Sequence, residues 1–152
     1  MVVACAALGA LCLLRGSGAG FKRLTEKDVC EMDGLVPLHL RRFSLRDVKA
    51  ATANFAKRQA IGEGESCQVF CGRLEGLGEV AMKRMKRVRH QGGAEGDLKA
   101  FLNEVALLSK AAHRHIVPLL GFCVEGGERI MLFPFYSGGS VATHFPGQWV
   151  SP

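Results

Sequence analysis

A single lysine inside a short apolar run constrains the fold of this chain most strongly. The run is Glu79–Met85, with the sequence EVAMKRM. Side chains alternate between the two faces of a strand, so Ala81 and Lys83 share one face. A lysine is costly to bury unless an anion or a carboxylate meets it. The sequence therefore predicts a strand whose neighbours bring a negative charge to Lys83.

Length and composition indicate one globular domain with a basic surface. The 152 residues leave room for a single domain, and the hydrophobic content of 48% is typical of folded chains. The net charge of +6 suits anionic partners such as nucleic acid, lipid headgroups or phosphates. The basic run Lys83–His90 contains no aromatic residue, which nucleic-acid patches often interleave with their cations. We therefore expect no nucleic-acid partner.

The six cysteines and the histidines do not have the spacing of a metal or disulfide site. No C-x-x-C pair is present. Cys67 and Cys71 would lie about 13 Å apart in a continuous strand, which is beyond disulfide reach. His113 and His115 have no third ligand nearby, so we expect them to serve a turn. The thiols are expected to be free, as in a reducing compartment.

The first fourteen residues, 1–14, are uncharged and mostly apolar. A bilayer span needs about 20 such residues, and a signal peptide would begin with a positive segment, which this start lacks. The segment could also be the end of a longer span, followed by the cationic flank Arg15, Lys22 and Arg23, or a poorly defined start. These interpretations stay open, with a membrane-associated origin favoured. Residues 15–40 are expected to form a basic, flexible, juxtamembrane-like linker.

A short amphipathic helix is predicted after this linker. Ser44 is a plausible N-cap, with Asp47 three residues later, and the helix should end near Asn54. The apolar positions recur at intervals of three to four, at Leu45, Val48, Ala51 or Thr52, and Phe55.

A glycine-rich hairpin follows the short helix. Gly62 and Gly64 stand at the end of a strand, where they permit a tight turn and close approach of a ligand to the backbone. The return run Cys67–Cys71 alternates as a strand would, and Glu75–Gly78 turns the chain into the lysine strand. These segments predict three antiparallel strands.

The second half of the chain predicts one long helix and two more strands. Asp97 can cap a helix that carries Glu104 at the border of its apolar stripe, from where a carboxylate can reach the sheet. His113–Cys123 and Arg129–Phe133 are predicted strands. The fold is thus an α+β fold, with a five-stranded antiparallel sheet, one main helix and a short preceding helix. The stripe consists of Leu98, Phe101, Leu102, Val105 and Leu108.

These motifs, in this order, resemble the N-terminal lobe of a eukaryotic protein kinase. More narrowly, the chain resembles plant receptor-like Ser/Thr kinases. The resemblance covers residues 41–145 and leaves 146–152 as an unstructured tail. The general kinase motifs are Ile61–Gly64 with Val69, Val80–Lys83 and Asn103–Val105, and the receptor-like ones are Phe43–Phe55, His113–Val117 and Leu120–Glu125.

The resemblance implies an ATP site. Lys83 would hold the ATP phosphates, and Glu104 would pair with its ammonium and fix its rotamer. The glycine-rich turn would cover the phosphates. It consists of Ile61, Gly62, Glu63 and Gly64.

The resemblance also implies an adenine pocket. Val69 and Ala81 would sandwich the base, although both could be plain core residues. Phe133 would be the gatekeeper, and the backbone of Pro134 and Tyr136 would meet the adenine edge. Proline keeps its carbonyl, so Pro134 can still accept a hydrogen bond.

The glycine-rich turn departs from the family pattern. Cys67 replaces the third glycine, Ser66 replaces the usual aromatic residue, and Glu65 adds a negative charge. Side chains there restrict approach to the backbone, and the charge repels phosphate. We therefore expect these residues to weaken nucleotide affinity.

Nothing after Gly139 resembles the H-R-D catalytic loop or the D-F-G metal site of protein kinases. The sequence therefore predicts an ATP-binding lobe without the C-lobe, from a truncated product or an incomplete gene model, that does not transfer phosphate alone. Mg²⁺ is expected only with the missing C-lobe. The alternative is a non-catalytic, pseudokinase-like module that docks on a kinase or receptor complex through an apolar surface near Leu108 and Leu119. We expect it at the cytoplasmic face of the plasma membrane if it belongs to a receptor kinase, and in the cytoplasm otherwise.

Overall fold

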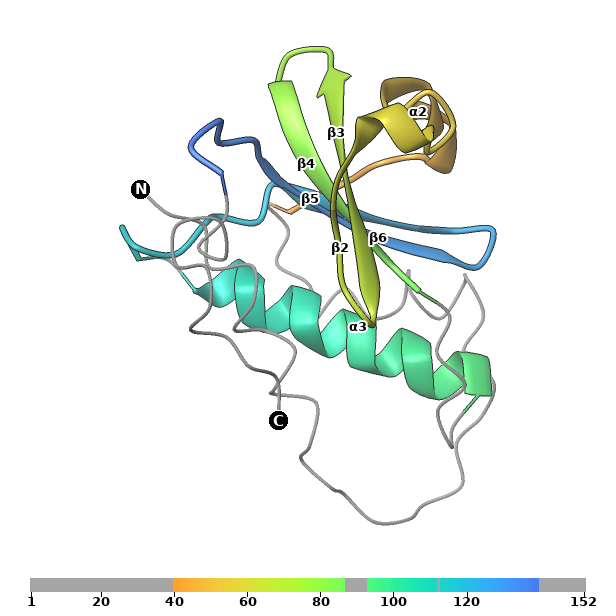
Figure 1. The fold of residues 1–152 in the computed structure, drawn as a ribbon. Helices are drawn as coiled ribbons and strands as arrows, with labels where there is room; N and C mark the ends of the chain where they lie inside the picture. The colour runs from red at the N-terminus through yellow and green to blue at the C-terminus, as the bar shows by residue number, and fades with distance from the viewer. Residues whose placement is uncertain (1–39, 87–92, 112, 140–152) are drawn as a thin grey trace.

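A computed structural model of the chain describes residues 40–86, 93–111 and 113–139. Within them, a curved sheet lies between two helices (Figure 1). The expected membrane-associated segment 1–14, the tail 146–152 and nearly all of the linker 15–40 lie outside the described residues. No helix among the described residues is long and apolar enough to cross a membrane.

The sheet has six strands in the order β1-β5-β6-β4-β3-β2. The five longer strands pair antiparallel, as predicted, but β1 pairs parallel with β5 and makes the sheet mixed. Two exposed arginines form β1, so the sequence has no alternation of apolar and polar residues that would predict this strand. The strands are β1 (Arg41–Arg42), β2 (Ala60–Glu63), β3 (Cys67–Leu74), β4 (Gly78–Met85), β5 (Gly121–Glu125) and β6 (Glu128–Pro134).

The prediction of a strand at His113–Cys123 was wrong in its position. The strand β5 begins at Gly121, and pairing with β6 extends back only to Leu120, whose N–H donates to the Leu132 carbonyl at 2.9 Å. Pro118 has no N–H to donate to a ladder, which favours irregular backbone before it. His113 and His115 serve a turn, as predicted, since His113 Nδ1 accepts from the His115 N–H at 3.2 Å.

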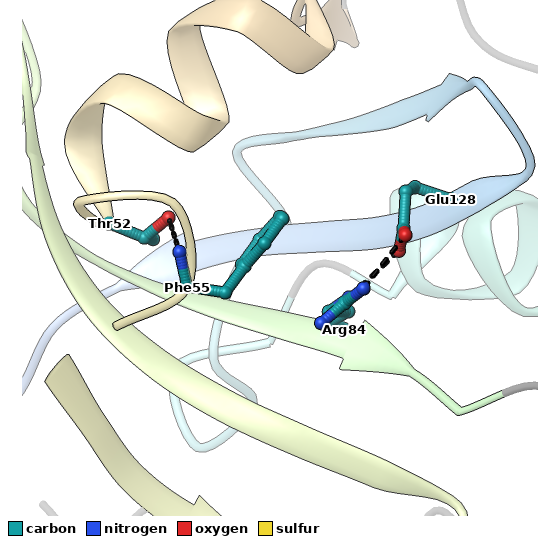
Figure 2. Close-up of polar contacts among 4 residues, drawn as sticks. All are labelled: Thr52, Phe55, Arg84 and Glu128. Atoms are coloured by element: carbon teal, nitrogen blue, oxygen red, sulfur yellow. Dashed lines mark hydrogen bonds and ion pairs between the residues drawn. The ribbon is translucent and has the colours of Figure 1, made fainter. Parts of the chain in front are cut away.

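The short helix α2 spans Leu45–Ala51, and a 3-10 turn follows at Lys57–Gln59. Ser44 is its N-cap, as predicted, and its hydroxyl accepts from the Asp47 N–H at 3.1 Å. The helix ends before the predicted Asn54, because the three residues from Ala53 to Phe55 have positive φ angles of 48°, 58° and 59°. The buried Thr52 hydroxyl stabilises the turn from Ala53 to Phe55 by accepting from the Phe55 N–H at 3.1 Å (Figure 2).

The main helix α3 spans Gly93–Lys110. The predicted cap at Asp97 was wrong, because the helix begins four residues earlier and the Asp97 carboxylate bonds Arg129 on β6 instead. Leu108 is buried, so the expected exposed surface does not include it. Its neighbour in sequence, Leu107, is exposed, as is Ile116 in the segment between α3 and β5.

Two apolar clusters fill the two faces of the sheet. One lies under α3 and the other under α2, so Figure 1 shows each helix against its own side of the sheet. The buried members of the α3 cluster are Phe101, Leu102, Val105, Leu108, Phe122, Val124 and Met131. Those of the α2 cluster are Phe43, Val48, Val80, Met82, Cys123, Ile130 and Leu132.

Candidate functional site

The strand β4 carries Lys83 to the face of the sheet that α3 covers. Val80 and Met82 pack in the α2 cluster, so strand alternation turns Lys83 to the opposite face. The Lys83 side chain is 10% exposed. An ammonium at this depth requires an anionic partner, as the sequence indicated.

Glu104 on α3 supplies that partner. Lys83 Nζ donates to Glu104 Oε1 at 2.9 Å, and the glutamate side chain is 19% exposed. The helix delivers the carboxylate because Phe101, Leu102 and Val105 pack on the sheet around it. An ammonium has three donors, and among the described residues only Glu104 accepts from Lys83. Two donors therefore remain for oxygens of a ligand.

Three of the residues proposed to meet adenine, Val69, Ala81 and Phe133, share the sheet face of Lys83. Val69 is the cross-strand partner of Lys83, and Ala81 pairs with Phe133. Both Val69 and Ala81 are half-buried, so neither is sealed inside the core. Pro134 ends β6 and Tyr136 follows it, half-buried. Pro134 pairs with Val80, so alternation turns its side chain toward the α2 face, and only its backbone is available beside Ala81 and Phe133.

The glycine-rich turn closes the hairpin between β2 and β3. The Gly64 N–H donates to the Cys67 carbonyl at 2.8 Å, which leaves Glu65 and Ser66 exposed at the tip. A Cβ at Gly62 would lie 3.8 Å from Val69, in ordinary contact, and neither Gly62 nor Gly64 has a positive φ. Neither backbone conformation nor packing against the described part of the chain therefore requires these two glycines.

Lys86 connects the glycine-rich turn to the end of β4 through two hydrogen bonds. Its Nζ donates to Glu63 Oε1 at 2.8 Å and to the Gly64 carbonyl at 2.9 Å. The Lys86 ammonium holds the pKa of Glu63 below its ordinary value. The sequence did not indicate this contact, since Lys86 stands in a basic run without a patterned acidic partner.

Arg84 and Glu128 form a different polar group on the α2 face. Two guanidinium nitrogens of Arg84 donate to the two carboxylate oxygens of Glu128 at 2.8 and 2.7 Å, and the ring of Phe55 stacks on the guanidinium at 4.3 Å (Figure 2). The bond to Glu128 raises the pKa of Arg84. A cavity of about 300 Å³ adjoins this pair, and Lys83 is not among the residues that line it.

Cys71 and Cys123 form no disulfide within the described residues. Burial raises the pKa of Cys123 to about 12, and burial also raises the pKa of Cys71. Neither is therefore poised as a nucleophile. No group of three or more His, Cys, Asp or Glu side chains within the described ranges is arranged to hold a metal ion.

The chain belongs to the protein tyrosine and serine/threonine kinase family, whose model matches residues 55–148. Among plant proteins, it is 36% identical over 142 residues to cysteine-rich receptor-like protein kinase 30 of Arabidopsis thaliana, and 37% identical over 114 residues to kinase 34 of the same group. These matches cover 93% and 75% of this chain but only 19% and 16% of the relatives. The predicted resemblance to plant receptor-like kinases is thus confirmed.

A solved structure also shares the fold. The apo form of a pseudokinase superposes with a TM-score of 0.60 at 22% identity, over 71% of this chain and 41% of that one. The similarity confirms the α+β fold of a kinase N-lobe.

Proposed function

We propose that the described residues form the ATP-holding lobe of a plant receptor-like Ser/Thr kinase. The ion pair of 2.9 Å between Lys83 and Glu104 carries this proposal. Glu104 orients the ammonium, and the ammonium keeps two donors for phosphate oxygens. The family uses ATP and Mg²⁺, and the bound nucleotide supplies the phosphoryl group that a complete kinase transfers.

The surroundings of Lys83 fit a nucleotide. Gly62 and Gly64 are glycines that the fold itself does not require, and close approach of phosphate to the backbone explains them. The half-buried Val69 and Ala81 offer apolar surface to a base beside Lys83. We assign the adenine edge to the backbone of Pro134 and Tyr136, with Phe133 as gatekeeper.

The described residues contain the positioning half of a kinase site. A proton acceptor for the substrate hydroxyl and the Mg²⁺ ligands come from the C-lobe in this family. We therefore propose that this part of the chain binds nucleotide and does not transfer phosphate by itself. The names of its relatives support a place at the cytoplasmic face of the plasma membrane, which membrane fractionation of tagged protein would test.

Nucleotide binding by the purified 152-residue chain tests the proposal. Titration calorimetry with ATP, with and without Mg²⁺, should show saturable binding. Lys83→Ala should weaken it about tenfold or more, because a charge-assisted hydrogen bond contributes about 1.5–3 kcal/mol. Lys49→Ala, on the exposed side of α2, is the matched control and should bind as the wild type does. Equal affinity in the Lys83 variant, or no binding by a folded chain, would overturn the proposal.

A further inference from the structure

A second shielded ion pair joins α3 to the sheet. Arg129 Nη2 donates to Asp97 Oδ2 at 3.2 Å, and the two side chains are 9% and 11% exposed. In this pair, as in Lys83–Glu104, both side chains are less than one fifth exposed. Neither Asp97 nor Arg129 belongs to the nucleotide site proposed above.

The two pairs are aligned on both the helix and the sheet. Asp97 precedes Glu104 by seven residues, which is nearly two helical turns, so both carboxylates leave the same side of α3 about 10 Å apart along its axis. On the sheet, Met131 is the cross-strand partner of Lys83, and Arg129 lies two residues before it on β6. Strand alternation therefore places both cations on the α3 face.

The packing of α3 is uneven along its length. The buried apolar residues that fix it begin at Phe101, whereas Leu98 is only partly buried. Buried apolar packing therefore holds the second half of α3 on the sheet more firmly than the first half. A hydrogen-bonded ion pair has a defined geometry and can specify a single arrangement. The Asp97 contact supplies such a constraint in the first half of the helix.

We propose that Asp97 and Arg129 are positioning residues that set the angle of α3 and so keep Glu104 within reach of Lys83. A helix held mainly through its second half can tilt at its first half, whereas a further attachment at Asp97 removes this freedom. Loss of the Asp97 contact therefore loosens the Lys83–Glu104 pair from a distance. The expected change in nucleotide affinity rests on the function proposed above. The expected change in the chemical reactivity of the Lys83 amine does not.

The reactivity of the Lys83 amine tests this directly. In the full chain, acetylation of Lys83 by acetic anhydride is measured by mass spectrometry relative to the exposed Lys49. Glu104→Gln sets the level for an unpaired Lys83. Asp97→Asn should raise the relative reactivity at least severalfold, toward the Glu104→Gln level, and the double variant should add little. Glu79→Gln, which removes the exposed pair with Arg73, is the matched control and should change nothing.

Two results would overturn the proposal. One is an unchanged Lys83 reactivity in folded Asp97→Asn. The other is a double variant, Asp97→Asn with Glu104→Gln, in which the two increases in Lys83 reactivity multiply as independent effects would. If Asp97→Asn fails to fold because it leaves Arg129 buried and unpaired, the double variant Asp97→Leu with Arg129→Met removes both charges and keeps the packing. It should then show the same rise in Lys83 reactivity, and a wild-type value there refutes the positioning role.

Nucleotide titration separates this proposal from the function it rests on. If the wild type binds ATP, Asp97→Asn and Glu104→Gln should weaken binding by similar factors, with no further loss in the double variant. If the wild type binds no nucleotide, the proposed function fails, while the acetylation result still decides whether Asp97 positions Glu104.

Discussion

The two faces of the sheet place their charges differently. The α3 face carries the pairs Lys83–Glu104 and Asp97–Arg129 between helix and sheet, largely shielded from solvent. The α2 face has a purely apolar cluster, and its Arg84–Glu128 pair lies between two strands, with the arginine side chain 31% exposed. Ion pairs thus connect helix and sheet on the α3 face, whereas on the α2 face the Arg84–Glu128 pair joins neighbouring strands and the Glu125 carboxylate accepts from the Leu45 N–H at 2.8 Å. The difference teaches that the position of α3 depends on paired side-chain charges, whereas α2 is held by apolar packing and by a contact to its backbone.

Adjacent residues of β6 provide the strongest test of this difference. Met131 and Leu132 are both fully buried, the first under α3 and the second under α2. Truncation of either to alanine should lower the free energy of unfolding by about 2–5 kcal/mol, because it leaves a cavity. Guanidinium unfolding followed by circular dichroism measures this loss. Only Met131→Ala, next to Lys83 in the sheet, should also raise the acetylation of Lys83. An equal rise in Leu132→Ala would show that the faces are not independent.

Removing the charges of the Arg84–Glu128 pair tests whether the α2 face is independent of the α3 face. Glu128→Leu leaves the Arg84 guanidinium without its bidentate partner and should lower the free energy of unfolding by about 1–3 kcal/mol. The double variant with Arg84→Leu should recover most of the loss, since no unpaired charge remains. Lys83 reactivity should stay at its wild-type level in both variants. A change there would show that the two faces are coupled through β4.

The sequence predicts most of the fold because the apolar patterns are local. The glycine hairpin, the lysine strand and the stripe of α3 were all found from their periods, and the Lys83–Glu104 contact followed from a costly buried charge. The start of β5 was misplaced because the predicted strand included Pro118, which has no N–H to donate to a ladder. The short strand β1 was missed because its pairing is set by β5, which is distant in sequence. Asp97 was assigned to a cap for the same reason, since its partner Arg129 is 32 residues away.

A sharper signal for the second pair was present in the sequence. Asp97 stands on the same helical face as Glu104, and Arg129 alternates with Met131 and Phe133 on the strand face of Lys83. Opposite charges on two facing elements predict a contact only when the register between them is known. That register comes from the packing of α3, which no local pattern determines.

A smaller effect is expected at the turn that follows α2. Thr52 is fully buried, and its hydroxyl donates to the Val48 carbonyl at 2.8 Å while it accepts from Phe55 (Figure 2). Thr52→Val keeps the shape but leaves the Phe55 N–H without this acceptor, so the free energy of unfolding should fall by about 1 kcal/mol. Thr52→Ser retains the hydroxyl and should lose less. Chemical denaturation of both variants measures the difference, and a larger loss in the serine variant would contradict this account.

The smallest effect is expected at Glu63, which is fully exposed and pairs with Lys86 beside the glycine-rich turn. Lys86 holds the Glu63 pKa below its ordinary value of 4.5. A folded-state pKa that is lowered contributes stability above the unfolded-state value, and this contribution is lost as the pH falls through the folded-state pKa. Lys86→Gln should therefore move the Glu63 midpoint up toward 4.5, as followed by carboxyl NMR titration. Lys57→Gln removes only a weaker, through-space charge and should move it less. An unmoved midpoint in the Lys86 variant would mean that the Lys86–Glu63 ion pair does not form in solution. The glycine-rich turn would then not depend on this pair for its position.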